Sequence, residues 1–284
     1  MATTIAAAIS SGAARLSAAG FDTPRLDIEI LVRHLLGIDR TALFVRPHEP
    51  LSDQKLADLG ALVDRRLAGQ PIAYLTGERE FMGMPFRVGP GVLVPRPETE
   101  LLVEDALAWL KNRDEQAVLD VGTGSGAIAI SIAKLSPNSK VIASDASMDA
   151  LRWAALNRDE LHAPVELVLG DLTEPFSGPI DFLLANLPYL RPEQLAGNRD
   201  IQAEPEMALV SGIDGLDLIR RLLAAAPRVM SSRGAIGLEI DPDQTRAVES
   251  LARDRFPNAI ITTRVDLAGF PRHVWVDLSS GGTE

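Results

Sequence analysis

The chain has 284 residues, of which 46% are hydrophobic and 24% are charged, and its formal net charge is −11 at pH 7. This composition is typical of a globular protein, and the length suggests two domains. The sequence contains no cysteine, which excludes disulfides, cysteine-based metal sites and cysteine nucleophiles. Neither a secretory leader nor an apolar run near the ~20 residues that span a bilayer is apparent. We therefore expect a cytoplasmic protein without a membrane segment.

The negative charge is concentrated in the second part of the chain. Residues 1–75 hold eight basic and eight acidic side chains, so the net charge of −11 comes from the residues that follow. Nucleic-acid phosphates are bound by Lys and Arg, so an acidic second part disfavours direct nucleic-acid binding. A local basic patch is still compatible with this average.

Residues 1–75 are predicted to form a small helical domain. Thr23 supplies a helix cap, and Pro24 stands at the first helical position. A second helix begins at Ser52 and ends at Gly69. Its apolar stripe has helical spacing and consists of Leu56, Leu59, Val63 and Leu67. We find no chemistry-bearing motif in this domain.

Residues 76–96 are apolar and punctuated by glycine, which predicts a hairpin linker. Residues 95–100 then open a helix with acidic side chains in its first turn. Strands and helices alternate from there, so we expect an α/β domain over 97–284 with a parallel sheet covered on both faces. The expected strands cover 117–121, 140–145, 165–169, 181–186, 235–240 and 259–265, and a last strand at 273–278 is expected to pair antiparallel.

A glycine loop, residues 122–126, follows the first strand of this domain. It reads Gly122, Thr123, Gly124, Ser125 and Gly126, and it precedes an apolar helix. Glycine permits a sharp turn and the close approach of a ligand, and ligands of open α/β sheets bind at the carboxyl ends of the strands. The G-x-G-x-G spacing differs from the G-x-G-x-x-G of dinucleotide sites. A simple tight turn is the alternative interpretation.

Three acidic residues at successive strand ends favour the ligand interpretation. Asp120 precedes the glycine loop, Asp145 ends the second strand and Asp171 follows the third. A carboxylate at Asp120 suits an ammonium group, and one at Asp145 can accept both hydroxyls of a ribose. Asp171 and Leu172 are placed to contact an adenine ring, although Asp171 alone would also fit a turn cap. Together these groups predict S-adenosylmethionine as the cofactor.

The acceptor motif, residues 186–189, closes the fourth strand and reads Asn186, Leu187, Pro188 and Tyr189. The Asn186 side-chain oxygen and the Leu187 carbonyl can accept the two hydrogens of one planar NH₂ group. Pro188 restricts the backbone that presents both oxygens, and Tyr189 can pack against a flat acceptor. These four residues are the predicted catalytic and substrate-binding set. A loop that merely ends a strand is the alternative.

Such a site needs no general base before attack, because the nitrogen can lose its proton after it becomes cationic. Catalysis then depends on positioning and electrostatics. Glu98 and Glu100 are candidate acids, but their place in a first helical turn favours a role as helix N-terminal charges. No metal site is predicted, because the histidines match no metal spacing; they are His34, His48, His162 and His273.

These motifs together resemble the HemK-type release factor glutamine methyltransferases, from about residue 20 to the end of the chain. The resemblance is carried by residues 71–77, 95–100, 120–126, 186–189, 204–205, 215–216 and 238–240, with Phe81 and Gln244. It implies a helical N-terminal domain that recognises a protein substrate. It also implies a seven-stranded, Rossmann-like class I methyltransferase domain that methylates the glutamine amide in the Gly-Gly-Gln motif of peptide chain release factors.

The resemblance also assigns roles to residues. It implies that the glycine loop, Asp145, Leu172 and Asn186 contact the cofactor, and that the acceptor motif holds the glutamine. The family usually reads Asn-Pro-Pro-Tyr, whereas this chain has Leu187 at the second position. The hydrogen-bond argument is unchanged, because the required group is a backbone carbonyl. Without the proline ring the backbone is less rigid, and ~0.4–1 kcal/mol of pre-organisation is lost.

Asn-Leu-Pro-Tyr also resembles the motif of ribosomal RNA adenine dimethyltransferases. Glutamine methylation of a ribosomal protein and methylation of an adenine amino group in nucleic acid are therefore alternatives, and the acidic charge balance disfavours the second. A binding protein that has kept the fold without activity is disfavoured by Asp120, Asp145 and Asn186. We expect a monomer, because the sequence has no obvious interface motif.

Overall fold

The computed structural model describes residues 3–198 and 200–279. The chain divides into two compact units, one comprising Met1–Glu78 with Arg199–Ala203 and the other Arg79–Asn198 with Glu204–Glu284. The first boundary falls inside the predicted linker, while the finer division into 1–75, 76–96 and 97–284 stays a prediction. Among the described helices, none combines the length and apolar character of a membrane-spanning segment.

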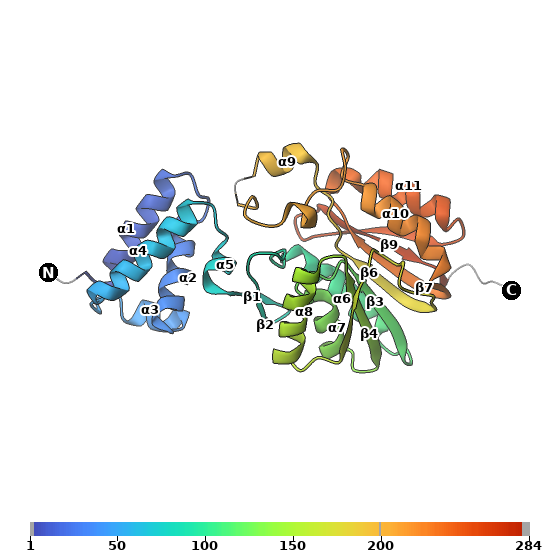
Figure 1. Ribbon diagram of the computed structural model, residues 1–284, viewed down its shortest axis with the longest axis horizontal. Helices are drawn as coiled ribbons and strands as arrows, with labels where there is room; N and C mark the ends of the chain where they lie inside the picture. Colours follow the sequence, from blue (N-terminus) through green and yellow to red (C-terminus); the bar gives the residue numbers. More distant parts are fainter. Residues whose placement is uncertain (1–2, 199, 280–284) are drawn as a thin grey trace. The chain divides into compact units, whose positions relative to one another are not determined.

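The N-terminal unit is helical, as expected (Figure 1). Its helices are α1 Ile5–Ala18, α2 Pro24–Leu36, α3 Arg40–Val45, α4 Asp53–Leu67 and α5 Ile72–Thr76. Ser52 caps α4 by accepting from the Lys55 N–H at 3.3 Å. Thr23 is the N-cap residue of α2 and Pro24 begins the helix, as predicted, but the Thr23 side chain makes no capping bond and its hydroxyl donates to Asp27 instead. Apolar side chains of α1, α2 and α4 form the core of this unit.

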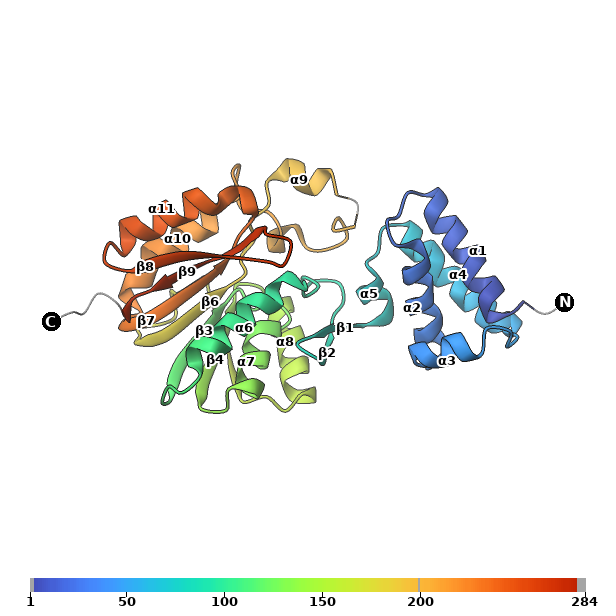
Figure 2. The same cartoon turned by 180° about the vertical axis from the view of Figure 1, so that it is seen from behind.

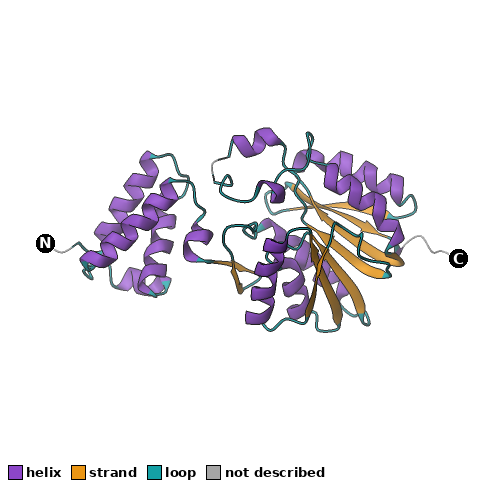
Figure 3. Ribbon diagram, in the orientation of Figure 1, coloured by secondary structure: helices purple, strands orange, loops and turns teal. Residues whose placement is uncertain are grey.

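A two-stranded hairpin, β1 Glu78–Phe81 with β2 Met84–Arg87, occupies the predicted linker. Beyond it, seven strands form one sheet in the order β5-β4-β3-β6-β7-β9-β8. They are β3 Gln116–Val121, β4 Ser139–Asp145, β5 Val165–Leu169, β6 Ile180–Ala185, β7 Met230–Glu239, β8 Ile260–Val265 and β9 Pro271–Asp277. β5, β4, β3, β6 and β7 run parallel, and β9 is antiparallel to both of its neighbours. This confirms the expected α/β sheet with an antiparallel last strand (Figure 3).

Helices cover both faces of the sheet (Figures 1 and 2). α6 Glu98–Leu110, α7 Ala127–Leu135 and α8 Met148–Glu160 lie on one face, and α10 Asp217–Ala225 and α11 Thr245–Arg255 lie on the other. Successive side chains of a strand point to opposite faces, so Phe182 of β6 joins the core under α6 and α7, and Leu183 joins the core under α10 and α11. A short helix, α9 Pro192–Ala196, follows β6.

The sheet order places the carboxyl ends of β5, β4, β3 and β6 side by side. The ends of these strands and the loops that follow them contain the glycine loop, all three predicted acidic residues and the acceptor motif. Segments more than 60 residues apart in sequence therefore meet at one edge of the sheet, as open parallel sheets generally bring their functional loops together.

Candidate active site

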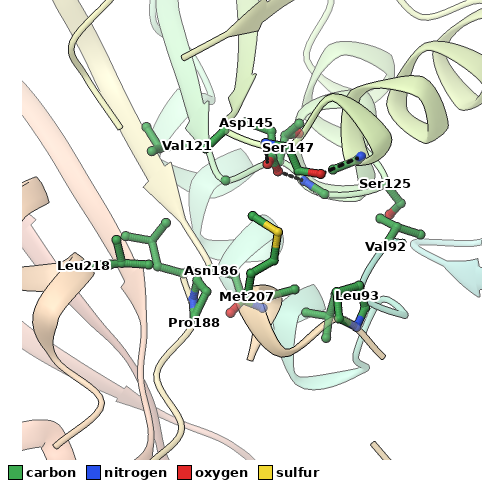
Figure 4. Close-up of a pocket in the computed structure, with 18 of the residues that line it drawn as sticks. Val92, Leu93, Val121, Ser125, Asp145, Ser147, Asn186, Pro188, Met207 and Leu218 are labelled. Carbon is green, nitrogen blue, oxygen red and sulfur yellow. Dashed lines mark hydrogen bonds between the residues drawn. The ribbon is translucent and has the colours of Figure 1, made fainter. Parts of the chain in front are cut away.

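A cavity of about 360 Å³ lies at the carboxyl edge of the parallel strands. Ten predicted site residues line it, namely Gly122, Thr123, Gly124, Ser125, Asp145, Asp171, Leu172, Asn186, Leu187 and Pro188. The other three, Asp120, Gly126 and Tyr189, lie outside this lining. Figure 4 shows Asp145 and Ser147 on one side of the cavity and Asn186 and Pro188 on the opposite side.

The glycine loop is tied to the end of β4 and packed against the acceptor motif. The N–H groups of Gly122 and Thr123 donate to the Ser144 carbonyl at 2.8 and 2.9 Å. Gly122 has a φ of +73°, a conformation that other residues rarely adopt. A Cβ at this position would lie 2.9 Å from the Leu187 Cδ2. Glycine is therefore required here both by the turn and by the neighbouring side chain.

Asp120 lies beneath the glycine loop and is fully buried. Its Oδ2 accepts from the Thr123 hydroxyl at 2.6 Å and from the Ala129 N–H at 3.1 Å. Its Oδ1 has no hydrogen-bond partner within the described part of the chain. Burial raises the pKa of Asp120 to about 7, and the two hydrogen bonds only partly oppose this rise. Asp120 therefore fixes the loop from below and retains one oxygen with unused acceptor capacity.

Asp145, by contrast, lies in the wall of the cavity. Its Oδ2 accepts from the Gly124 N–H at 2.9 Å, and its Oδ1 accepts from the Ser147 N–H at 2.8 Å. Burial raises its pKa, and backbone hydrogen bonds from Ser147, Gly124 and Ala146 act in the opposite direction. A carboxylate has about four acceptor positions, so acceptor capacity remains on both oxygens.

The residues after β5 form another part of the wall. Leu172 is buried, with a φ of +49°, and supplies an apolar surface. Asp171 pairs with Arg221 of α10 at 2.6 Å, and both side chains line the cavity. No motif indicated this cation, which balances the charge of Asp171.

The acceptor motif lies between two adjoining cavities. A smaller one of about 80 Å³ is lined by Tyr189 and shares Asn186, Leu187 and Pro188 with the larger. The larger volume is in the range of small-ligand sites, whereas the smaller one has room only for the tip of a side chain. The Leu187 side chain is buried against the glycine loop.

A hydrogen bond to α6 fixes the orientation of the Asn186 amide. The Asn186 Nδ2 donates to the Thr99 Oγ1 at 3.0 Å, across 87 residues of sequence. The Asn186 oxygen therefore lies on the opposite edge of the amide, away from Thr99. Thr99 is itself buried and lines the larger cavity.

The Tyr189 hydroxyl donates to the Glu239 Oε1 at the end of β7, at 3.4 Å. Glu239 is buried, and burial raises its pKa to about 7, while hydrogen bonds from Thr99 and Tyr189 lower it. Burial and the nearby Glu239 charge raise the pKa of Tyr189, so its phenol stays neutral and can donate. Whether the Tyr189 ring packs flat on an acceptor, as we expect, stays a prediction.

Two loops that border the site are joined by Glu204. The Glu204 side chain is fully buried. Its Oε2 accepts from the Val94 N–H at 2.9 Å, and its Oε1 accepts from the Arg96 guanidinium at 2.5 Å. Both loops line the larger cavity, through Arg96 and Pro205 respectively. This buried pair therefore holds the segment before α6 against the segment that follows the acceptor motif.

Sequence reasoning missed several residues of this site. Thr99 was read only as part of a helix start, and Glu239 only as part of a family match. The further cavity residues without a prediction include Val92, Leu93, Met207, Leu218 and Arg221. Thr99 could have been noticed, because it follows two prolines in a segment that carries the family resemblance. The apolar residues gave no signal that separated them from core residues.

The parallel sheet with its antiparallel β9, the glycine loop after β3, the acid that ends β4 and the acceptor motif after β6 define a Rossmann-like methyltransferase domain. Residues 97–206 match the family model "Methyltransferase small domain", and residues 7–77 match "PrmC N-terminal domain". A solved methyltransferase from Pyrococcus furiosus has the same fold, with a TM-score of 0.53, 18% identity, and coverage of 79% of this chain and 99% of that one.

Curated relatives specify the family. The chain is 41% identical to the release factor glutamine methyltransferase of Moorella thermoacetica, over 88% of this chain and 90% of that protein. It is 37% identical to the protein of the same name from Mycolicibacterium smegmatis, over 96% of this chain and 97% of that one. The chain belongs to the family of release factor glutamine methyltransferases.

Proposed function

We propose that this protein transfers a methyl group from S-adenosylmethionine to the side-chain amide nitrogen of the glutamine in the Gly-Gly-Gln motif of peptide chain release factors. The observation that carries the proposal is the position of Asn186, Leu187 and Pro188, which line both a cavity of about 360 Å³ and one of about 80 Å³. The first suits a nucleoside-sized cofactor, and the second suits a planar amide.

The residues around the larger cavity fit this cofactor. The glycine loop has no side chain at Gly122 or Gly124 and allows close approach of a ligand. Asp145 retains acceptor capacity on both oxygens for the two hydroxyls of a ribose. Leu172 offers an apolar surface for an adenine ring. The Asp120 Oδ1, unpartnered among the residues described, lies buried beneath the glycine loop, so we expect it to act on an ammonium group through water.

When bound, the cofactor would supply a methyl group carried on a positively charged sulfur, whose bond to carbon would break as the carbon–nitrogen bond forms and leave a neutral thioether. The amide nitrogen is a weak nucleophile, because resonance delocalises its lone pair. The Asn186 Oδ1 and the Leu187 carbonyl can accept its two hydrogens and aim it at the larger cavity. Both acceptors also stabilise the positive charge that develops on the nitrogen as the bond forms.

No side chain of the acceptor motif needs to remove a proton before attack. Asn186 has no titratable proton, and the pKa of Tyr189 is raised by burial, so neither acts as a base near neutral pH. The cationic nitrogen loses its proton after methyl transfer, when that loss is strongly favourable. The rate therefore depends on how rigidly the two acceptor oxygens are held.

The other parts of the proposal concern partners and location. A release factor is the protein substrate, and its place in translation termination implies a cytoplasmic enzyme. The neutral charge of residues 1–75 and the acidic remainder support a protein partner over direct nucleic-acid binding. We retain a monomer as the expected state.

Methyl transfer from labelled cofactor to a purified release factor tests the proposal. A release factor with Gln→Ala in its Gly-Gly-Gln motif is the matched control, and ribosomal RNA and ribosomal proteins serve as alternative acceptors. We expect label only in the unaltered release factor. Equal labelling of the two release factors, or label only in RNA or in a ribosomal protein, would contradict the assigned acceptor.

A further inference from the structure

We propose that Thr99 and Glu239 are positioning residues that orient the polar groups of the acceptor motif. Thr99 determines which edge of the Asn186 amide faces the substrate, and Glu239 determines the direction of the Thr99 hydroxyl and holds Tyr189. The activity part of this inference rests on the proposed function.

Glu239 is a buried acid that the fold does not explain. It is the last residue of β7, its residue exposure is 3%, and its Oε2 has no hydrogen-bond partner in the described segments. Across residues 3–198 and 200–279, no basic side chain lies within 4.0 Å of it as an ion pair. Burying an ionisable group in this way is unfavourable, which favours a role in the neighbouring site.

Its two polar contacts both lead to the acceptor motif. One is the Tyr189 hydroxyl, 3.4 Å from Oε1. The other is the Thr99 side chain, which acts on Glu239 as a neighbouring donor and lowers its pKa. Thr99 in turn accepts from the Asn186 Nδ2 at 3.0 Å. Glu239 therefore contacts residue 189 directly and residue 186 through one hydroxyl.

The number of available hydrogens determines which group donates and which accepts in each of these contacts. When Glu239 is ionised it can only accept, so a hydrogen bond between it and Thr99 uses the single hydroxyl hydrogen of Thr99. The Thr99 oxygen then faces Asn186 as an acceptor, and only the NH₂ edge of Asn186 can satisfy it. The Asn186 oxygen is consequently turned toward the side from which a substrate amide approaches.

The reverse orientation would abolish the acceptor geometry. If the Asn186 amide were flipped, its oxygen would face the Thr99 oxygen and its NH₂ would face the NH₂ of the substrate. Both contacts would be unfavourable, since the first would place two acceptors together and the second two donors. Asparagine amides flip readily when nothing distinguishes their two edges, so the Thr99 contact supplies the distinction.

Titratable groups approach Glu239 from every element packed against it. They are Glu98 on α6, Tyr189 in the acceptor motif, and Arg272 and His273 on β9. Glu98 raises the pKa of Glu239, and Arg272 lowers it. His273 is bonded to Asp105 at 2.8 Å, and burial lowers its pKa, so it stays neutral near pH 7. Glu239 therefore ionises near pH 7. Higher pH favours the orientation in which the Asn186 oxygen faces the substrate.

The test compares Thr99→Val, which removes the hydroxyl at nearly constant volume, with Thr99→Ser, which keeps it. We expect Thr99→Val to lower kcat about 10–100-fold through misplacement of Asn186, with KM for the release factor and Kd for the cofactor changed less than about threefold. Thr99→Ser should restore most of the loss. Thr263→Val is a matched control, because it removes a half-buried Thr–Glu hydrogen bond, to Glu249 at 2.7 Å, whose residues do not line either cavity.

A second readout needs no substrate. The side-chain NH₂ signal of Asn186 in the ¹⁵N-labelled enzyme, identified by its loss in Asn186→Asp, should move to the position of an unbonded amide in Thr99→Val and stay near its original position in Thr99→Ser. This measurement remains decisive if the wild-type enzyme fails to methylate a release factor. Failure of the proposed function and failure of this inference are thereby distinguished.

Glu239→Gln tests the second positioning residue, because it keeps the size and an acceptor oxygen but cannot ionise. We expect kcat of the wild type to rise with pH through about 7 and the rise to be smaller in Glu239→Gln. Asp120 titrates in the same range, so only the difference between the two profiles is assigned to Glu239. The inference is overturned by identical profiles, by a Thr99→Val kcat within twofold of wild type, by an equal loss in Thr99→Ser, or by an unmoved Asn186 signal.

Discussion

Asp145 offers the most direct test of the cofactor site. Each of its oxygens already accepts one backbone N–H, from Gly124 at 2.9 Å and from Ser147 at 2.8 Å. The remaining acceptor positions are assigned to the two hydroxyls of a ribose. Asp145→Ala removes both of those contacts and leaves the two N–H groups to be satisfied by water.

The structure gives the expected size of this loss. Hydrogen bonds to a charged group contribute about 1.5–3 kcal/mol. The two hydroxyls share one carboxylate, and Asp145 is only partly buried, so water recovers part of their combined contribution. We therefore expect a total loss of about 1.5–3 kcal/mol, which raises the Kd for the cofactor about 10–150-fold. Asp145→Asn keeps one acceptor oxygen and should fall between the wild type and Asp145→Ala.

Isothermal titration calorimetry measures this directly. Because burial raises the pKa of Asp145, the titration is done at pH 8, where the carboxylate is ionised. Asp149→Ala is the control, since it also removes one negative charge near the cavity, from an exposed side chain paired with Arg152. Its Kd should stay within about twofold of wild type. A Kd for Asp145→Ala within threefold of wild type would refute the reasoning.

Three further predictions follow from the site. Asn186→Ala should lower single-turnover methyl transfer about 10²–10³-fold, because it removes one of the two acceptor oxygens; a loss below about threefold would show that the side chain is not central. Leu187→Pro should retain at least about a third of kcat, since the carbonyl remains. Its Tm should fall, because a buried side chain loses packing. A far larger loss of kcat would mean that the leucine side chain itself shapes the acceptor site. The folded-state pKa of Asp120 is raised from 3.8 to about 7, so the native state holds a proton there that the unfolded chain releases, and stability falls as pH rises from about 4 to about 7. Urea unfolding should show a loss of stability between pH 5 and pH 8 that is smaller by about 2 kcal/mol in Asp120→Asn, because Glu239 titrates in the same range and contributes to the loss in both proteins; an equal loss in both proteins would contradict the assignment.

Much of the methyltransferase unit was predictable because its central strands, such as β3 and β6, are buried on both faces. Such strands read as continuous apolar runs, and the glycine loop and the acidic residues mark where they end. β7 is longer than expected, since its first half contains the exposed polar residues Ser232 and Arg233. α10 and α11 were not predicted, although Ile219, Leu222 and Leu223 recur at helical spacing and are buried.

The sequence alone determined which functional groups are available and after which strands they lie. It placed an acid at the end of each of three strands and an Asn-x-Pro-Tyr segment after a fourth. It also indicated that the backbone carbonyl of residue 187 is the required group, so that a leucine side chain is tolerated there. These inferences depend on residue type and local order, which the chain carries directly. The same local order also predicted that the loops would meet at one edge of a parallel sheet.

Only the tertiary structure decided how those groups are held. It placed Asp120 beneath the loop and outside the cavity lining, and it paired Asp171 with Arg221. It also brought Thr99 to Asn186 and Glu239 to Tyr189. Hydrogen-bond partners separated by 50 or more residues are set by strand order and helix packing, and neither leaves a periodic signal in the sequence. The orientation of one asparagine amide is therefore a property of the folded chain, fixed by a hydroxyl and a buried carboxylate on two other elements.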